Sequence, residues 1–375
     1  MASSTALKGD ELGKTEKDKG NVISDDDGAC KTTLEVIDSQ VYASSETVDV
    51  TGYEQSSEDK ESLPAEMPDY PMDNEDDLPP MEILPNSSHR DGAIYRGTDI
   101  WKTDYYIADR NETGLEAMMF SDPTDCFIHN GTCISHATCH MLQMLSLKLA
   151  KIPAEHHSVE LYGYIAARDM LDPLLNYFVN FSRDNPIVVE QGSLIHMAGP
   201  KRAIRLIGTI LNEYDMKIKT GQHEKEDLQL INGVSIIDDI DTWNCSPFKC
   251  RIHGDYGAID IAATRLNFAV EATIEVVISQ VQSSFSMQLG CFTSGLHEEI
   301  QLFDGAIGES RGLKRSVVAV VMGDQVDLKF KVAGDSCIRA EHCCSFKANM
   351  HGHATQEIKT DFALIRVKVT WSTLD

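Results

Sequence analysis

The chain has 375 residues, 42% of them hydrophobic, and a formal net charge of −26 at pH 7. This length suits one large domain with a tail, or two average domains. The acidic charge argues against nucleic-acid binding and against adhesion to an anionic membrane, because both depend on lysine and arginine side chains. We therefore expect the partner to be a protein or a small ligand.

Residues 1–92 are predicted to form a disordered acidic arm. This stretch is rich in Asp, Glu, Ser, Lys and Pro, and it holds too little apolar surface to offset an ordering entropy of about 1–2 kcal/mol per residue. We interpret it as a solubilising tail, with a docking arm for a basic partner as the alternative.

No targeting segment is recognisable in the sequence. The first residues lack the apolar stretch of a secretory signal, and no uncharged apolar run reaches the roughly 18 residues that span a membrane. We therefore expect an intracellular protein, cytoplasmic or nuclear, whose ten cysteines are reduced thiols.

Residues 93–140 are predicted to be a partly ordered connecting segment. They carry four aromatic side chains that are suited to packing on a neighbour, namely Tyr95, Trp101, Tyr105 and Tyr106. They also carry a loop rich in cysteine and histidine, which runs from Cys126 to His140.

Residues 141–375 show the period-two alternation that is typical of half-buried strands. Leu145, Leu147 and Leu149 alternate with smaller or polar residues, and the same pattern recurs at 159–166, 214–219, 259–261, 270–276, 326–332 and 365–371. Glycine-containing turns separate these runs. The pattern predicts a mainly β domain, built as an antiparallel β-sandwich or a pair of packed sheets.

The β region is predicted to contain an internal duplication, with halves at 141–240 and 250–375. The first half carries three anchors, at 159–162, 201–204 and 214–221, which resemble 270–273, 314–317 and 326–334 in the second half. The alternative is chance, because the period-two pattern makes all amphipathic strands look alike.

Two groups of cysteine and histidine are candidate metal ligands. Thiolate and imidazole suit zinc, but neither spacing is a standard one, and adjacent strand residues point to opposite faces. The alternative reading is buried free thiols. The first group comprises Cys337, His342, Cys343, Cys344, His351 and His353; the second comprises Cys126, His129, Cys133, His136, Cys139 and His140.

Two basic pairs are candidate ligand-binding residues on an otherwise acidic chain. Lys201-Arg202 and Lys314-Arg315 each precede an apolar strand and are suited to an anionic ligand. The alternative is an exposed strand entry, because Lys and Arg are usually solvated. The acidic run 238–241 is read as a turn in preference to a calcium loop, since it lacks further oxygen ligands.

The sequence contains no convincing catalytic or cofactor motif. Residues 308–312 fit the spacing Gly-x-Ser-x-Gly around Ser310, but a strand is predicted to follow, whereas a nucleophile elbow needs a helix there. We therefore expect a polar turn at Ser310. Enzyme activity is left open with a leaning against it, and no cofactor is expected.

The chain from residue 92 onward resembles an uncharacterised family of grass proteins, the domain of unknown function 6598. The segments that carry this resemblance are 144–152, 161–169, 198–202, 215–219 and 367–372. The resemblance covers roughly 240 residues, which is the domain length of that family. It implies a plant protein with a role in stress or defence.

Some members of that family look like C-terminal partners of ribosome-inactivating domains. The resemblance therefore implies, as one alternative, an accessory or relative of an rRNA N-glycosidase. That activity needs a Glu-Ala-x-x-Arg helix in the toxin family, and residues 258–265 lack the glutamate and are predicted as a strand. Our leading hypothesis is a non-enzymatic module that binds a protein or small ligand, and a metal-binding protein is the third possibility.

Overall fold

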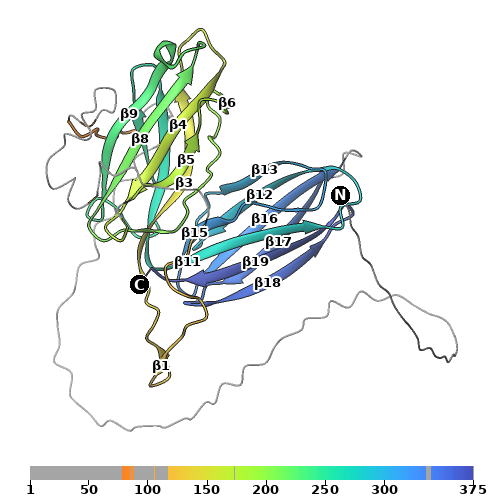
Figure 1. The fold of residues 1–375 in the computed structure, drawn as a ribbon. Helices are drawn as coiled ribbons and strands as arrows, with labels where there is room; N and C mark the ends of the chain where they lie inside the picture. Colours follow the sequence, from red (N-terminus) through yellow and green to blue (C-terminus); the bar gives the residue numbers. More distant parts are fainter. Residues whose placement is uncertain are drawn as a thin grey trace, which may run out of the picture. The chain divides into compact units, whose positions relative to one another are not determined.

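The computed structural model describes residues 78–85, 87, 105, 117–172, 174–334 and 339–374. Within them the chain is mainly β-strand, and every pairing between named strands is antiparallel (Figure 1). This confirms the fold class that the alternating pattern predicts. The greater part of the predicted acidic arm lies outside the described residues. None of the described segments forms a helix long and apolar enough to cross a membrane.

The first half of the described β region is a sandwich around one hydrophobic core. One of its sheets has the strand order β5-β4-β8-β9, with β6 beside β4. These strands are β4 (Ser158–Arg168), β5 (Asn176–Phe181), β6 (Ile187–Glu190), β8 (Thr209–Lys219) and β9 (Leu228–Asp238). The facing strands are β3 (Cys139–Lys151), β7 (Ile204–Arg205), β10 (Phe248–His253) and the first part of β11 (Ala258–Ser279).

The second half repeats this arrangement around a second core. Its four-stranded sheet has the order β13-β12-β16-β17, made of β12 (Phe285–Thr293), β13 (Ile300–Ile307), β16 (Gln325–Gly334) and β17 (Arg339–Lys347). Facing it are the rest of β11 with β14 (Arg311–Gly312), β15 (Ser316–Val321), β18 (Gly352–Lys359) and β19 (Leu364–Ser372).

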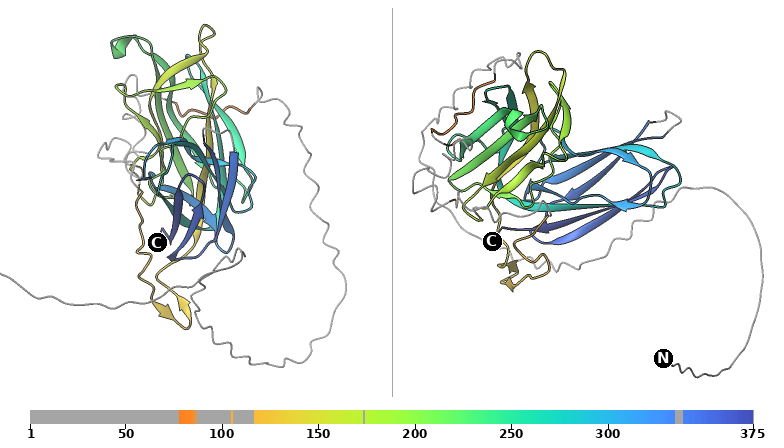
Figure 2. Two further views of the ribbon diagram at one scale, coloured as in Figure 1. Left: turned by 90° about the vertical axis from the view of Figure 1, so that its right-hand side faces the viewer. Right: turned by 45° about the horizontal axis from the view of Figure 1, so that its top comes forward.

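Strand β11 joins the two halves, because its 22 residues run through both cores (Figures 1 and 2). It pairs with β3 and β10 in its first part and with β15 and β19 in its second part. Strand β3 lies where the cores meet, so Met141 and Leu145 belong to the second core and Leu142 and Met144 to the first. This position explains why both faces of β3 are buried there.

Two of the three repeat anchors fall on equivalent strands. Each Lys-Arg pair precedes the strand that pairs with the first long strand of its half, β7 on β3 and β15 on β11. The anchors at 214–221 and 326–334 fall on β8 and β16, which hold the same place in their sheets. The remaining anchor is out of register, because 159–162 lies in β4 and 270–273 in β11, whereas the partner of β4 by position is β12.

Residues 78–85, which were predicted to belong to the acidic arm, lie instead along the edge of the first half. The backbone N–H groups of Met81 and Leu84 donate to the carbonyls of Arg251 and Val234, at 2.9 and 2.8 Å. Met81 and Ile83 pack against the first core. Their apolar side chains provide the buried surface that orders this segment. The acidic composition of the arm as a whole did not indicate it.

Candidate functional site

The predicted Lys201-Arg202 pair is buried at the junction of the two halves. Arg202 is fully buried, and its Nη1 and Nη2 donate to the two carboxylate oxygens of Asp169, both at 2.7 Å. The alternative reading of an exposed strand entry is therefore wrong here, because the ion pair compensates the buried charge. Anion binding at this pair stays a prediction, and an anion would compete with Asp169 for the guanidinium.

Glu271 lies beside this ion pair. It accepts hydrogen bonds from the Ala203 N–H at 2.6 Å and the Ser372 hydroxyl at 2.8 Å. Burial raises the pKa of Glu271 to about 7, although these two hydrogen bonds and the nearby Arg202 lower it. Glu271 lies in the alternating run 270–276, which was predicted as a half-buried strand, and the structure buries this glutamate completely.

The second basic pair lies nearer the surface. Lys314 is exposed, and Arg315 is half-buried with its Nη1 4.0 Å from Glu275 Oε1. Because Arg202 belongs to a buried network and Arg315 to a partly exposed ion pair, the two pairs present different surroundings to any ligand. Anion binding at Lys314 and Arg315 also stays a prediction.

The first predicted metal group is spread over two strands and the turn between them. His342 and Cys343 are neighbours in β17, His353 is exposed on β18, and Cys337 lies outside the described residues. Cys343 is exposed and Cys344 is buried, as expected for adjacent residues on a strand.

The structure joins one residue of that group to three residues of the other. Potential ligand atoms of Cys126, Cys133, His136 and His351 all lie within 4.8 Å of one another. The Cys133 Sγ is 3.3 Å from His136 Nδ1, and the rings of His136 and His351 have centroids 5.0 Å apart. We call these four residues the Cys/His cluster.

The two thiols of the Cys/His cluster share hydrogen bonds that move their pKa values apart. The hydrogen bond with Cys126 lowers the pKa of Cys133 to about 7, and the bonds with His136 and nearby backbone groups act in the same direction. The same shared hydrogen bond raises the pKa of Cys126 to about 11. Cys133 is therefore the more acidic of the two thiols.

Two other sequence motifs have the structure that was predicted. Asp238 caps its own turn, since the Ile240 N–H donates to its Oδ1 at 2.8 Å, which confirms an acidic turn. Ser310 is exposed between β13 and β14, so a strand and not a helix follows it. This confirms the polar turn.

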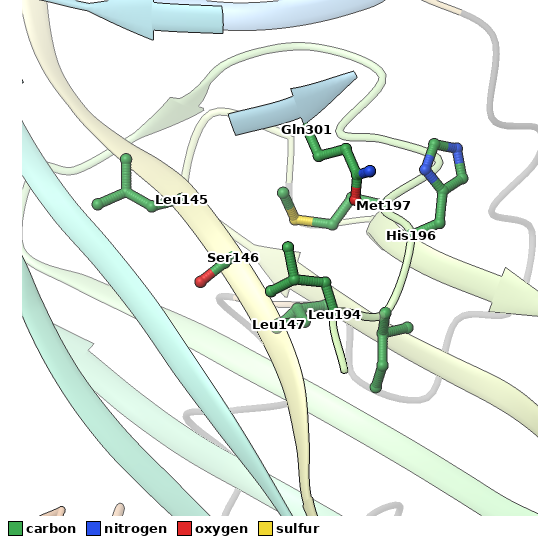
Figure 3. Close-up of a pocket in the computed structure, with 8 residues that line it drawn as sticks. Leu145, Ser146, Leu147, Leu194, His196, Met197 and Gln301 are labelled. Atoms are coloured by element: carbon green, nitrogen blue, oxygen red, sulfur yellow. The ribbon is translucent and has the colours of Figure 1, made fainter. Parts of the chain in front are cut away.

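A small pocket lies between β3 and the segment 194–197, with Gln301 of β13 at its edge (Figure 3). Its cavity volume is about 10 Å³, the space of a single water molecule and far below the about 300–1,000 Å³ of typical ligand pockets. Its lining is largely apolar, and burial lowers the pKa of its one imidazole, His196. A single imidazole beside apolar side chains and an amide provides no acid and base pair.

A larger but open hollow lies at the turns 151–153 and 253–257. Its ionisable residues are all exposed to solvent, namely Lys151, His253, Asp255 and Tyr256. Neither hollow gathers the convergent, buried ionisable groups that are typical of an active site.

Sequence reasoning missed an exposed apolar surface on two neighbouring loops and on an irregularity of strand β11. Its four side chains are Ile207, Ile240, Trp243 and Phe268, with exposed fractions of 48%, 81%, 70% and 65%. The loops are hydrogen-bonded to one another, since Gly208 N–H donates to Asp239 Oδ2 at 3.3 Å. We call these four residues the apolar loop surface. The feature of the sequence that could have indicated this surface is a tryptophan, Trp243, inside a polar turn.

Comparisons with known proteins identify a family and no activity. Residues 141–369 match the model of the family described as Domain of unknown function (DUF6598). The comparison with curated proteins gives no match. Among solved structures, a human GIVD cytosolic phospholipase A2 is 8% identical, with a TM-score of 0.23, and the match covers 64% of this chain and 30% of that one.

The C2A- and C2B-domains of extended-synaptotagmin 2 give a similar result. They are 8% identical with a TM-score of 0.22, and the match covers 68% of this chain and 99% of that one. The present chain spans only 30% of the length of the phospholipase. Likenesses at these TM-scores assign neither fold nor function.

Proposed function

The chain belongs to the family Domain of unknown function (DUF6598), and from this premise we propose that it is a non-enzymatic β-sandwich module that binds a protein partner through the apolar loop surface. The observation that carries the proposal is the exposure of Ile240 and Trp243 on one loop and of Phe268 on the adjoining strand β11. Exposed apolar patches rimmed by polar residues mark interaction sites, and aromatic residues dominate binding energy at such sites.

The loop and the strand segment that carry these side chains are held in place before any partner binds. Arg265 Nη1 donates to the carbonyls of Asp239 and Thr242, at 2.6 and 3.3 Å. The Asn267 N–H donates to Asn244 Oδ1 at 2.7 Å. A fixed set of loops lowers the entropy lost on binding, because fewer side chains and backbone torsions must be ordered.

The backbone at Phe268 supports the same proposal. Its φ of +53° lies in the left-handed region, which costs a residue other than glycine about 1–2 kcal/mol. Strained backbone of this kind concentrates at functional sites. Here it holds a large aromatic side chain that is 65% exposed and whose ring contact is edge-on with His140, at 5.8 Å between centroids.

The charge of the chain defines the chemistry of the partner. Asp238, Asp239 and Asp241 surround Ile240 in the sequence, and the chain as a whole carries −26. An apolar surface with an acidic rim favours a protein segment that combines apolar side chains with lysine or arginine. The same charge disfavours an anionic membrane.

Peptide display against the immobilised full chain tests this function. We expect the selected peptides to combine Leu, Phe or Trp with Lys or Arg, and to lose binding to Trp243→Ser and Phe268→Ser. Val188→Ser is the matched control, because Val188 is an exposed apolar residue on β6. Peptides that bind Trp243→Ser as tightly as the wild type would contradict the proposal.

An accessory role beside an rRNA N-glycosidase is the alternative that the family resemblance offers. Residues 258–265 form part of β11 and are not a helix, so no observation on this segment favours depurination by the chain itself. Incubation of the purified chain with ribosomes, followed by an assay for the released adenine, separates the two functions. Depurination would replace a binding module with an enzyme.

A further inference from the structure

We propose that Cys126, Cys133, His136 and His351 form a structural zinc site that fixes the segment 117–136 to the turn between β17 and β18. The four ligand atoms lie within 4.8 Å of one another. Two sulfur and two nitrogen donors are the set that zinc binds in tetrahedral geometry. The site is independent of the apolar loop surface.

The spacing of the donors is close to that of a zinc centre. Zinc lies about 2.3 Å from sulfur and about 2.0–2.1 Å from nitrogen, so a tetrahedron places sulfur and nitrogen roughly 3.5 Å apart. The Cys133 Sγ and His136 Nδ1 are 3.3 Å apart. One edge of the tetrahedron is therefore already formed, and the other ligands need only small side-chain movements.

His136 is oriented for metal binding by a second hydrogen bond. Its Nε2 lies 3.0 Å from the carbonyl oxygen of Asp122, to which an Nε2–H donates. This bond leaves Nδ1 as the lone-pair nitrogen, and Nδ1 is the atom that faces Cys133. Histidines that bind zinc commonly donate the other ring N–H to a carbonyl in this way. The carbonyl of Asp122 is itself held, because the Asp125 N–H also donates to it at 3.1 Å.

The hairpin between the two cysteines has no core of its own. Strands β1 (Ile128–His129) and β2 (Thr132–Cys133) pair only with each other, and the hairpin stands apart from the larger sheets (Figures 1 and 2). An isolated two-stranded hairpin is marginally stable in water. Its apolar side chains stay exposed, with fractions of 61%, 58% and 60% for Phe127, Ile128 and Ile134. A metal crosslink supplies the stability that burial does not.

The fourth ligand comes from a distant part of the chain. His351 lies just before β18, and the next residue, Gly352, donates its N–H to the carbonyl of Pro123 at 2.9 Å. Ser121 is bonded to Thr373 through its hydroxyl, which accepts from the Thr373 N–H at 2.8 Å. The zinc would therefore complete an attachment that backbone hydrogen bonds have begun.

A four-ligand site has a structural role. Catalytic zinc keeps one position open for water or substrate, whereas structural zinc takes four protein ligands. Two thiols and two imidazoles fill all four positions here. A disulfide between Cys126 and Cys133 is the competing use of the thiols, and it would leave the oriented His136 and the adjacent His351 without a shared role.

The metal content of the full chain, purified reduced and without chelator, tests the site directly. We expect about one zinc ion per chain, lost from Cys133→Ser and His351→Asn. The matched controls are Cys343→Ser and His353→Asn, which change the same residue types at exposed positions of the neighbouring strands. Both controls should keep the zinc.

Cobalt(II) substitution supplies a second measurement that reports the ligands themselves. The wild type should give the visible absorption of a tetrahedral cobalt centre together with a thiolate-to-cobalt band. Cys126→Ser and Cys133→Ser should each weaken the thiolate-to-cobalt band. His136→Asn should shift the visible bands and leave the thiolate-to-cobalt band in place.

Folding defects in the variants are separated from metal loss by work on the wild type. A chelator should remove the zinc and make the 117–136 segment more sensitive to protease, and added zinc should restore its protection. The proposal is overturned if the folded, reduced wild type holds no zinc and gives no cobalt spectrum. A Cys126–Cys133 disulfide in that preparation would overturn it too, as would equal loss of zinc from Cys343→Ser.

Discussion

Arg202 and Asp169 form a bidentate ion pair at the junction of the two β-sandwich halves, with both N–O distances at 2.7 Å and both side chains almost fully buried. Arg202 also donates to the carbonyls of Ala203 and Asp172, both at 2.8 Å. Removing one partner would leave an uncompensated charge in the interior.

Replacement of Arg202 by methionine should lower the free energy of unfolding by about 3–5 kcal/mol, because Asp169 would stay buried without its counter-charge. Urea unfolding checks this value. The double variant Arg202→Met with Asp169→Asn should recover part of the loss. Arg315→Met is the control, and its partly exposed pair with Glu275 should cost less than about 1 kcal/mol. Equal losses of unfolding free energy in Arg202→Met and Arg315→Met would show that the buried ion pair stabilises the fold no more than the partly exposed one.

The stability of the protein should fall as the pH rises through the range in which Glu271 ionises. Burial raises its folded-state pKa to about 7, above the roughly 4.3 of an unfolded chain, so the folded state binds the extra proton between these values. The contribution is complete below about pH 4 and lost above about pH 7, and it amounts to about 3–4 kcal/mol.

Glu271→Gln supplies the comparison for this pH dependence. Its amide imitates the protonated carboxyl, because it can accept from the Ala203 N–H and donate to the Ser372 hydroxyl. Urea unfolding from pH 5 to pH 8 should show the wild type losing stability relative to Glu271→Gln. Parallel profiles for the two proteins would contradict this assignment.

Gly131→Ala should weaken zinc binding by about tenfold, provided that the Cys/His cluster holds the metal. Asn130 and Gly131 have φ values of +50° and +80°, the tight hairpin turn in which an alanine costs about 1–2 kcal/mol. Open space surrounds the added methyl group, so the backbone alone causes the loss. Competition with a chromogenic chelator measures the affinity. Gly323→Ala, which has the same handedness of backbone far from the cluster, should leave that affinity unchanged.

Phe268→Asn should stabilise the protein while it weakens the binding of selected peptides. Asparagine tolerates the left-handed backbone better than phenylalanine, so we expect a gain of about 0.5–1 kcal/mol. Thermal unfolding and peptide titration check the two effects. Trp243→Asn should weaken binding without the gain, because the backbone of Trp243, unlike that of Phe268, is not left-handed. A loss of stability in Phe268→Asn would mean that its side chain packs usefully.

The sequence predicted the strands well because their signal is local. The alternating burial at Leu145–Leu149 and at 326–332 requires only that each strand has one solvent-exposed face. Strands β3 and β16 include the residues that this alternation predicted. The pattern could not show that Glu271 is buried, because that depends on a second layer of the sandwich and on Arg202. The equivalence of β7 and β15 was visible because both follow a Lys-Arg pair.

The candidate sites were harder to predict because they are assembled over long distances. Cys126, Cys133 and His136 lie more than two hundred residues before His351 in the sequence, and no spacing rule connects them. Each group was recognised as chemically suitable, but the ligands were divided between two groups. The apolar loop surface was missed because an isolated Trp243 has no periodic pattern.

The continuity of β11 has a consequence for how the molecule denatures. Neither core can come apart without breaking the ladder of hydrogen bonds along a strand that the other core also uses. The two halves should therefore melt together, and calorimetry of the described β region should give one transition whose van't Hoff and calorimetric enthalpies agree. A hinge motion between the halves is disfavoured for the same reason, so a ligand bound at one half meets a partner surface that moves with it as a rigid body.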